Sequence, residues 1–248
     1  MLMVTALIWG TAFVAQKSGM DLISPIAFNG IRTLVGAFAL IPVIMVMGRD
    51  KKKKGWDRTL IAGGICSGLA LCASGNIQQI GLYLLCIPAS GFGAVNKGDI
   101  IMVICAVCFA VHILIIDYFS PKVDGVKLSC IQFFIAGIVS LIIAPFADPA
   151  IGFTLPSAGD ICDSWFSIFY AGVMSCSVAY TLQILGQRET EPAIASMILC
   201  LESVFALIAG MVLLGEMMSL REIIGCIIMF AAIFVANLPE DALKHPGT

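Results

Sequence analysis

Charge is scarce in this sequence. Only 12% of its 248 residues are Asp, Glu, Lys or Arg, and the formal net charge is −2. A soluble globular domain is about a quarter charged, so the composition excludes a water-exposed globule. No basic stripe with interleaved aromatic residues is present, which excludes a nucleic-acid partner. Most of the surface is therefore expected to meet a lipid bilayer.

Motifs for catalysis are lacking as well. The sequence has no GxxxxGK[ST] loop for nucleotide hydrolysis, no HExxH zinc spacing and no GxSxG nucleophile elbow. Most of its ten cysteines lie inside apolar runs, where cysteine is a small packing residue. Cys105 and Cys108 form a CxxC without further ligands nearby, so no metal site is expected. We expect no enzyme and no cofactor.

Apolar sequence is abundant instead. Hydrophobic residues make up 60% of the chain, and the mean hydropathy is +1.02. A helix needs about twenty apolar residues to cross a bilayer. Eight stretches meet this requirement, and they cover residues 2–17, 27–48, 60–86, 99–119, 126–147, 164–185, 193–214 and 221–238. The pattern predicts an all-α integral membrane protein with about eight transmembrane helices.

The third stretch is unusually long, and polar residues interrupt it. Asn76, Gln78 and Gln79 break its apolar character. It is either one tilted helix, or a helix that ends near Gln79 and is followed by an apolar stub at 82–87. The second interpretation is slightly favoured.

Orientation follows from the lysines and arginines of the short loops. The loop between the second and third stretches carries six of them within residues 49–58, which predicts a cytoplasmic loop. Counting from there places Lys122, Lys127 and Arg188 inside, and Asp148, Asp160 and Asp163 outside. Both termini are then cytoplasmic, in a multi-pass protein of the inner cell membrane.

The sequence also repeats itself. Residues 6–42 recur near 102–145, and residues 60–81 recur near 165–186. The alignment places Gln16 over His112, Asp21 over Asp117, Ser24-Pro25 over Ser120-Pro121, Arg32 over Gln132 after a small insertion, and Gln78 over Gln183. An odd number of spans separates the copies, so they enter the membrane with opposite polarity, as transporter repeats do. The alternative is that proline and aromatic residues recur at helix ends in any membrane protein.

Two motifs carry a family resemblance. The first is Ala6-Leu7-Ile8-Trp9-Gly10-Thr11-Ala12-Phe13, followed by Ser24-Pro25 and Arg32. The second is Glu191-Pro192-Ala193, then Leu201-Glu202-Ser203-Val204-Phe205-Ala206 and Leu213-Leu214-Gly215-Glu216. Together they resemble the EamA-type carriers of the drug/metabolite transporter superfamily, over nearly the whole chain. Ser203 stands where the family usually has proline.

The resemblance implies two inverted sets of five helices, but this chain departs from that pattern. Gln78-Gln79-Ile80-Gly81 resembles the end of the family's third helix, whereas the residues from Gly81 to Leu85 resemble the tail of its fifth. The fourth helix and most of the fifth are therefore missing. We expect a shortened first repeat at 1–90, a full second repeat at 99–239 and a cytoplasmic tail at 240–248, giving 3 + 5 helices.

Polar residues inside the apolar stretches are the candidate solute pathway. Glu202 lies near the middle of the seventh stretch, where a carboxylate is costly unless it faces protein or water. It either couples protons or makes a structural hydrogen bond. Arg32 either reaches the membrane interface or meets a solute carboxylate. Gln16 and His112 stand at equivalent repeat positions and either face each other across the pathway or, as is more usual for a lone histidine in a helix, His112 is simply hydrogen-bonded within the protein.

The remaining candidates either bind a polar solute or hydrogen-bond neighbouring helices together. They are Gln78, Gln132, Tyr180 and Gln183, together with Asn76 and Gln79. Trp9 is either a wall of the pathway or an interfacial anchor, and the same alternatives apply to Tyr118.

The resemblance implies a secondary carrier that exports small organic metabolites, such as amino acids, by alternating access. Its partners are then the small-molecule substrate, the lipid bilayer and possible further copies of the chain in a homo-oligomer. The alternative is a shortened, transport-incompetent paralogue that acts as an assembly partner or is a decayed gene product.

Overall fold

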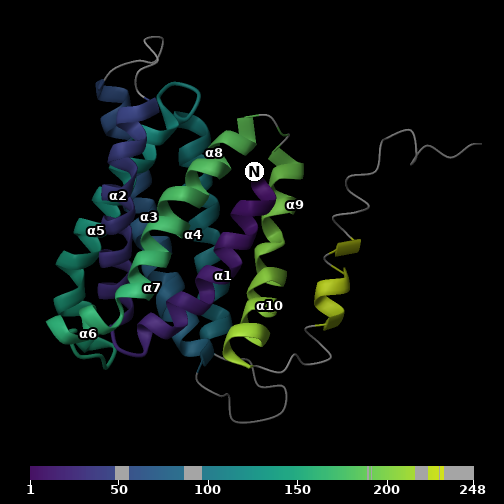
Figure 1. The fold of residues 1–248 in the computed structure, drawn as a ribbon. Helices are drawn as coiled ribbons and strands as arrows, with labels where there is room; N and C mark the ends of the chain where they lie inside the picture. Colours follow the sequence, from purple (N-terminus) through teal and green to yellow (C-terminus); the bar gives the residue numbers. More distant parts are fainter. Residues whose placement is uncertain are drawn as a thin grey trace, which may run out of the picture. The chain divides into compact units, whose positions relative to one another are not determined.

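The computed structural model describes residues 1–47, 56–86, 97–188, 190, 192–215, 223–228 and 230–231. Every regular element in this part of the chain is a helix (Figure 1). The elements are α1 (Leu2–Met20), α2 (Pro25–Met47), α3 (Arg58–Cys86), α4 (Lys97–Phe119), α5 (Gly125–Ala150), α6 (Ala158–Asp163), α7 (Trp165–Phe169), the π-helix η1 (Tyr170–Ala179), α8 (Tyr180–Arg188), α9 (Pro192–Cys200) and α10 (Glu202–Leu214). The predicted all-α class is confirmed.

Six helical segments of the described part are long and apolar enough to cross a membrane. They are Pro25–Val46, Arg58–Leu85, Lys97–Phe119, Gly125–Ala150, Trp165–Gln183 and Met197–Leu214. Helix α1 is not among them, and polar Gln16 and Lys17 lie near its end. The predicted eighth span, 221–238, lies mostly outside the described residues. A multi-pass helical membrane protein is thus confirmed, while the total of eight spans stays a prediction.

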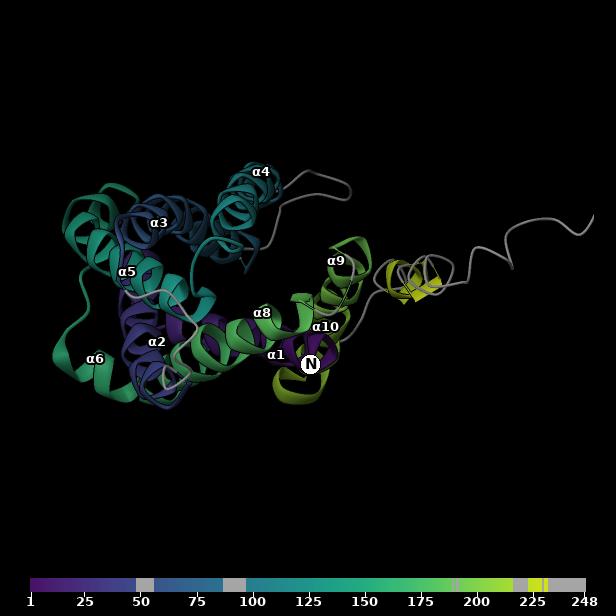
Figure 2. The same cartoon turned by 90° about the horizontal axis from the view of Figure 1, so that it is seen from above.

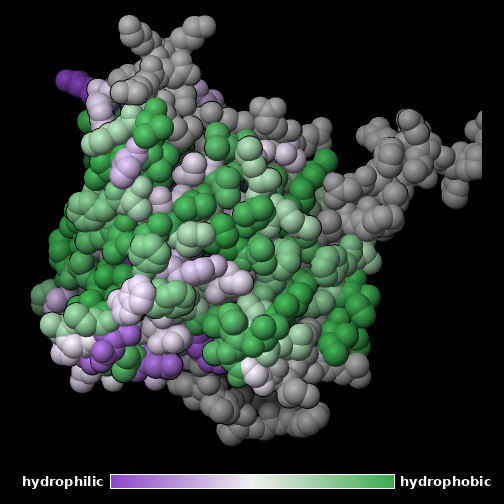
Figure 3. Space-filling model, viewed as in Figure 1, coloured by the Kyte–Doolittle hydropathy of each residue, from purple (hydrophilic) through white to green (hydrophobic). Residues whose placement is uncertain are grey.

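The surface is apolar where lipid is expected. In the most apolar stretch of α4 only 11% of the residues are buried inside the protein. Large side chains such as Val103, Val107 and Leu114 are more than 60% exposed. Figure 3 shows that hydrophobic residues dominate the coloured part of the face drawn there. In water this exposure would be unfavourable, whereas in a bilayer it needs no compensation.

The chain divides into two compact units. The terminal unit comprises Met1–Val14 and Ala179–Thr248, and the central unit comprises Ala15–Val178. The division passes through α1 and through the end of η1. These units differ from the predicted repeats, because the central unit combines helices of both. The repeat boundaries stay a prediction.

In the central unit, α5 packs against both α2 and α3, and α3 packs against α4 (Figures 1 and 2). Helices α2 and α5 run antiparallel, since Gly30 faces Leu141 while Gly137 faces Leu34. A Cβ on Gly137 would lie 2.6 Å from Cγ of Leu34. Small residues at the crossing therefore permit the close approach that membrane helices use in place of a hydrophobic driving force.

The start of α2 is held by a distant residue. The Asp148 carboxylate of α5 accepts hydrogen bonds from the Ser24 hydroxyl at 2.7 Å and from the backbone N–H groups of Ile26 and Ala27 at 3.2 and 3.1 Å. A carboxylate at a helix N-terminus satisfies free N–H groups and matches the helix dipole. The prediction that Asp148 lies in an outer loop is wrong, because α5 continues to Ala150 and buries it.

Helix α5 is capped locally, in contrast. Asp124 precedes it, and its carboxylate accepts hydrogen bonds from the N–H groups of Val126 and Lys127. Asp57 does the same for α3 through Leu60 N–H at 2.8 Å. Short polar residues at these loop ends explain where the two helices begin.

Helix α3 is continuous from Arg58 to Cys86, so the favoured break near Gln79 is wrong. Two interactions support the unbroken helix. The Gln79 amide is buried and hydrogen-bonded to Gln16, and Ile80, Leu82 and Tyr83 pack against a buried apolar cluster. The polar residues thus have a partner within the protein, and the helix need not end there.

The sixth and seventh predicted spans are less regular than the sequence suggested. The sixth contains α7, the ten-residue π-helix η1 and the first turn of α8. The seventh is interrupted at Leu201, between α9 and α10. Hydropathy measures only apolar content, so it predicted both as plain helices.

The terminal unit is held together by contacts of the first turns of α1. The Thr5 hydroxyl donates to the carbonyl of Ala179 at 3.2 Å. Ala6 forms a small buried cluster with Leu201 and Val204. A Cβ on Gly10 would lie 2.6 Å from the carbonyl oxygen of Glu202, so only glycine fits where α1 meets α10.

Candidate solute pathway

Arg32 is buried inside the central unit. Its side chain is only 7% exposed, although it sits in a membrane-spanning helix. Its Nε and Nη2 atoms donate to Oδ1 of Asn29, one turn earlier, at 3.1 and 3.0 Å. This arginine is hydrogen-bonded within the protein, and both predicted alternatives, a side chain that reaches the membrane interface and one that meets a solute carboxylate, stay predictions. A guanidinium buried in a span marks a functional site by default.

Asn29 links Arg32 to two further helices. Its Nδ2 donates to Oδ1 of Asn76 in α3 at 2.7 Å, and Asn76 Nδ2 donates to the Ser140 hydroxyl of α5 at 3.0 Å. Cys72 Sγ lies 3.4 Å from the same hydroxyl. These residues, with Arg32, form a buried polar cluster across α2, α3 and α5. Networks of this kind fix the position of each member.

A second polar pair joins α1 and α3. Gln79 Nε2 donates to Oε1 of Gln16, and both side chains are buried. The other amide atom, Gln79 Oε1, has no hydrogen-bond partner among the described residues. An unsatisfied buried acceptor costs about 1–3 kcal/mol, so a polar group that enters the protein here finds a favourable partner.

A third pair joins α4 and α5. His112 Nε2 lies 3.1 Å from Oε1 of Gln132, and both side chains are buried. Because amide oxygen is an acceptor, His112 carries its proton on Nε2 in this contact. The Nε2 of Gln132 has no hydrogen-bond partner in the described part of the chain. His112 thus has a partner within the protein, as the favoured alternative expects, and whether Gln16 and His112 face each other across a pathway stays a prediction.

Polar groups that could form further hydrogen bonds lie at several places in this unit. They are the guanidinium of Arg32 in the polar cluster, the acceptor Gln79 Oε1 in the second pair and the donor Gln132 Nε2 in the third, the last two without a hydrogen-bond partner among the described residues. A cation with a planar fork of donors suits a carboxylate. The amides suit neutral polar groups.

The terminal unit contributes other candidates. The rings of Trp9 and Tyr180 meet edge to face, with centroids 5.1 Å apart. Glu202 is the first residue of α10, directly after the interruption at Leu201. Its side chain is partly exposed, and no described residue hydrogen-bonds with its carboxylate. The geometry leaves this carboxylate available for a proton or a solute group.

Two predicted candidates have less support. Gln78 and Gln183 are half-buried, and neither makes a hydrogen bond to a described residue. The buried neighbour Gln79 takes the role expected of Gln78. Tyr118, named as a possible wall, is 62% exposed, and Lys122 Nζ lies 3.0 Å from its ring centroid. This cation–π contact suits an interfacial anchor.

Several important residues were missed at first. Asn29 stands three residues before Arg32, and that spacing on a helix could have identified the pair. Asp148 lies in α5 because the helix extends three residues beyond the predicted end of the span at 147. Ser140 gave no signal, since serine is common in membrane helices. No group of three metal-ligating residues occurs among the residues that the structure describes.

Comparisons with known proteins identify the family. A model of the EamA-like transporter family matches residues 1–85 and again residues 96–238. A protein of Archaeoglobus fulgidus named as an uncharacterised transporter is 25% identical, with 96% of this chain and 84% of the relative covered. A chloroplastic WAT1-related protein of Arabidopsis thaliana is 21% identical, covering 94% of this chain and 67% of the relative.

Proposed function

This chain belongs to the EamA-like transporter family, and from that premise we propose that it exports small organic metabolites such as amino acids. Family membership makes it a multi-pass membrane transporter of the drug/metabolite type, not an enzyme. The sequence has no nucleotide-hydrolysis motif, so the proposed carrier is a secondary one. It works by alternating access, with the solute bound near the membrane midplane.

The observation that carries the proposal is the buried polar cluster around Arg32. Burying a guanidinium is costly unless hydrogen bonds or an opposite charge offset the lost hydration, and here Asn29 accepts two of its N–H groups and is itself held by Asn76 and Ser140. The proposed solute places its carboxylate on Arg32. Gln16, Gln79, His112 and Gln132 then supply hydrogen bonds to its polar groups, and Glu202 is the proposed coupling carboxylate.

The proposed repeats are residues 1–90 and 99–239, followed by the tail 240–248. Two observations support them. Helices α2 and α5 share one pattern of burial, and they run antiparallel. Antiparallel copies are what an inverted repeat requires. In the proposed orientation both termini are cytoplasmic, in the inner membrane, because the positive-inside rule assigns the Lys- and Arg-rich residues 49–58 to the cytoplasm.

Flux measurements in proteoliposomes test the function. Wild-type protein should exchange labelled amino acids, with a rate that responds to an imposed proton gradient. Arg32→Gln, which introduces the residue of the counterpart position 132, should lower the flux at least tenfold. Lys122→Gln removes one positive charge outside the spans and should leave the flux unchanged. Equal flux for wild type and Arg32→Gln would refute the role of Arg32.

The second candidate function is a transport-incompetent paralogue that assembles with another carrier. A specific observation favours it: the first family match covers 85 residues, whereas the second covers residues 96–238. Both relatives align over more positions than the 248 residues of this chain, 280 and 284, so they carry residues that it lacks. Absence of flux for every solute tested, from protein that is folded and correctly inserted, would favour this candidate.

A homo-oligomer is the proposed way to complete the shortened first repeat. Light scattering on the detergent-solubilised protein gives the mass of the assembly directly. A monomer that nonetheless transports would show that eight spans are sufficient.

A further inference from the structure

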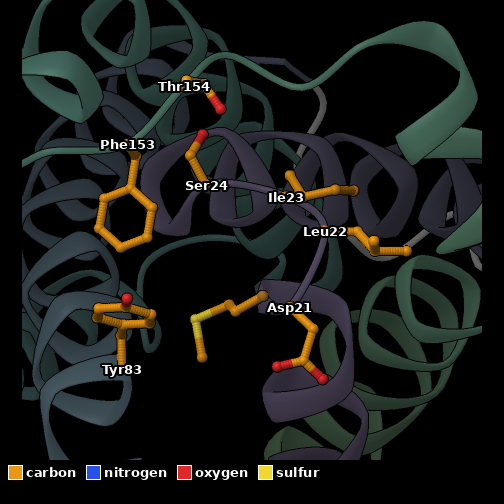
Figure 4. A pocket seen from close by; sticks show the side chains of 8 residues that line it. Asp21, Leu22, Ile23, Ser24, Tyr83, Phe153 and Thr154 are labelled. Carbon is orange, nitrogen blue, oxygen red and sulfur yellow. The ribbon is translucent and has the colours of Figure 1, made fainter. Parts of the chain in front are cut away.

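A cavity of about 300 Å³ opens at one end of the central unit (Figure 4). It lies where α1 ends, α2 begins, α3 ends and the chain leaves α5. Its lining residues are Met20, Asp21, Leu22, Ile23, Ser24, Tyr83, Phe153 and Thr154. The volume is at the lower end of the range for sites that bind small organic molecules.

One wall of the cavity is aromatic. The rings of Tyr83 and Phe153 meet edge to face, with centroids 4.6 Å apart and an interplanar angle of 72°. Figure 4 shows them together on one side, with Asp21 and Leu22 on the other. Tyr83 also packs against the buried cluster that contains Met20 and Ile23, so the wall is anchored in the core.

The charge of the cavity is negative. Asp21 is the one charged residue in its lining. Its side chain is exposed, and no described residue forms a hydrogen bond or ion pair with it. Lys17 precedes it by one turn of α1 but does not line the cavity. A carboxylate ligand would therefore be repelled here, and a cation would be attracted.

Ser24, at the start of α2, is a lining residue with a partner in the protein. The Ser24 hydroxyl donates to the Asp148 carboxylate, which also accepts two backbone N–H groups of α2. The acidic charge of Asp148 is thereby directed into the protein, away from the cavity. Because Ser24 is already held by this hydrogen bond, a ligand would not have to order this residue on binding.

We propose that this cavity binds an organic ammonium ion, with Asp21 as the counter-charge and the Tyr83–Phe153 wall against the apolar body. The Asp21 carboxylate attracts an ammonium group by charge, and the aromatic rings on the opposite side of the cavity offer a surface for the apolar body. A divalent metal ion is a poorer occupant, since it requires several oxygen ligands, and one carboxylate is available. The assignment rests on the proposed function in that the ammonium group belongs to the exported solute.

Equilibrium binding to the full chain in lipid nanodiscs tests the assignment. The probe is radiolabelled phenethylamine, and 3-phenylpropionate is its carboxylate counterpart of similar size. Saturable binding of the amine and none of the carboxylate is expected. Equal binding of the two probes, or no binding of the amine, would overturn the proposal.

Two variants locate the site. Asp21→Asn should weaken phenethylamine binding at least tenfold, while Asp117→Asn should not change it. Asp117 is the matched control, because it is an exposed carboxylate at the counterpart position near the end of α4. Tyr83→Leu should weaken phenethylamine binding more than methylamine binding, since methylamine has no aromatic body. Unchanged affinity in Asp21→Asn, or an equal loss in Asp117→Asn, would refute the site.

The binding and flux experiments can fail separately. Amine binding without flux would leave the cavity assignment standing and refute the carrier function. Flux without amine binding would do the reverse. Asp21 is exposed and has no partner among the described residues, so Asp21→Asn should keep the thermal stability of the wild type.

Discussion

Helix α2 begins at Pro25 and helix α5 at Gly125. From residue 28 to 42 in the first and from 128 to 142 in the second, each pair of counterpart positions is equally buried, half-buried or exposed. The chemistry differs, however. Helix α2 carries Asn29 and Arg32 where α5 carries Ser129 and Gln132. The packing surface is thus shared by the two helices, while the polar residues on it have diverged.

The two helices also begin differently. Asp124 caps α5 from the adjacent loop. The residue that caps α2, Asp148, instead lies 124 positions after Ser24 in the sequence. The first interaction is local and survives partial loss of packing. The second exists only while α2 and α5 are in contact. This difference makes the start of α2 dependent on the tertiary structure.

Asp148→Ala should have the largest effect. It leaves the Ser24 hydroxyl and two helix N–H groups without their buried partner. We therefore expect the free energy of unfolding to fall by about 2–4 kcal/mol. Thermal unfolding of the detergent-solubilised protein, followed by circular dichroism, measures the loss. A decrease in Tm no greater than that of Asp124→Ala would show that the two caps are equivalent.

Gly36→Ala should have the next largest effect. It makes α2 match α5, which has Ala136 at the counterpart position. A Cβ on Gly36 would lie 2.5 Å from Cβ of Cys176 and 2.9 Å from the carbonyl oxygen of Gly172. Overpacking against this backbone should lower the free energy of unfolding by about 1–3 kcal/mol, which the same unfolding assay measures.

Gly159→Ala is the control for that substitution. Its Cβ would meet only the Ser157 hydroxyl oxygen, at 3.5 Å. No loss of stability is expected there. A Gly36→Ala protein as stable as Gly159→Ala would mean that the two helices have interchangeable packing surfaces at this position.

Asp124→Ala removes the local cap of α5. The expected cost is about 1 kcal/mol, the typical value for an N-cap. Asp124→Asn should restore most of the stability, since an amide oxygen still accepts the two N–H bonds of Val126 and Lys127. Failure of asparagine to restore stability would indicate that charge, not hydrogen bonding, makes this cap effective.

The smallest expected effect concerns Asp160, which lies outside the spans. The backbone N–H of Ser157 donates to its carboxylate, and this bond, helped by the Ser157 side chain, lowers the pKa of Asp160. A lowered pKa stabilises the folded state above the ordinary value of about 4, and the contribution disappears as pH falls below it. Unfolding between pH 3 and 6 should therefore show a slightly weaker pH dependence in Asp160→Asn.

Sequence reasoning identified the membrane class, the positions of most helices and the polar candidates, because those follow from hydropathy and residue type. It could not identify the partners. His112 and Gln16 stand at counterpart positions, but the glutamine to which each is hydrogen-bonded could not be identified from the sequence. The π-helix η1 could not be predicted either, because apolar content carries no information on which backbone groups form hydrogen bonds with each other.

The Asp148 interaction has a consequence for biogenesis. Helix α2 is synthesised about a hundred residues before α5. When its first turn forms, the N–H groups of Ile26 and Ala27 therefore still lack their acceptor. Completion of that turn therefore waits for the later helix to leave the ribosome. Nascent chains arrested before Asp148 should expose this turn to protease, and chains arrested well beyond it should protect the turn.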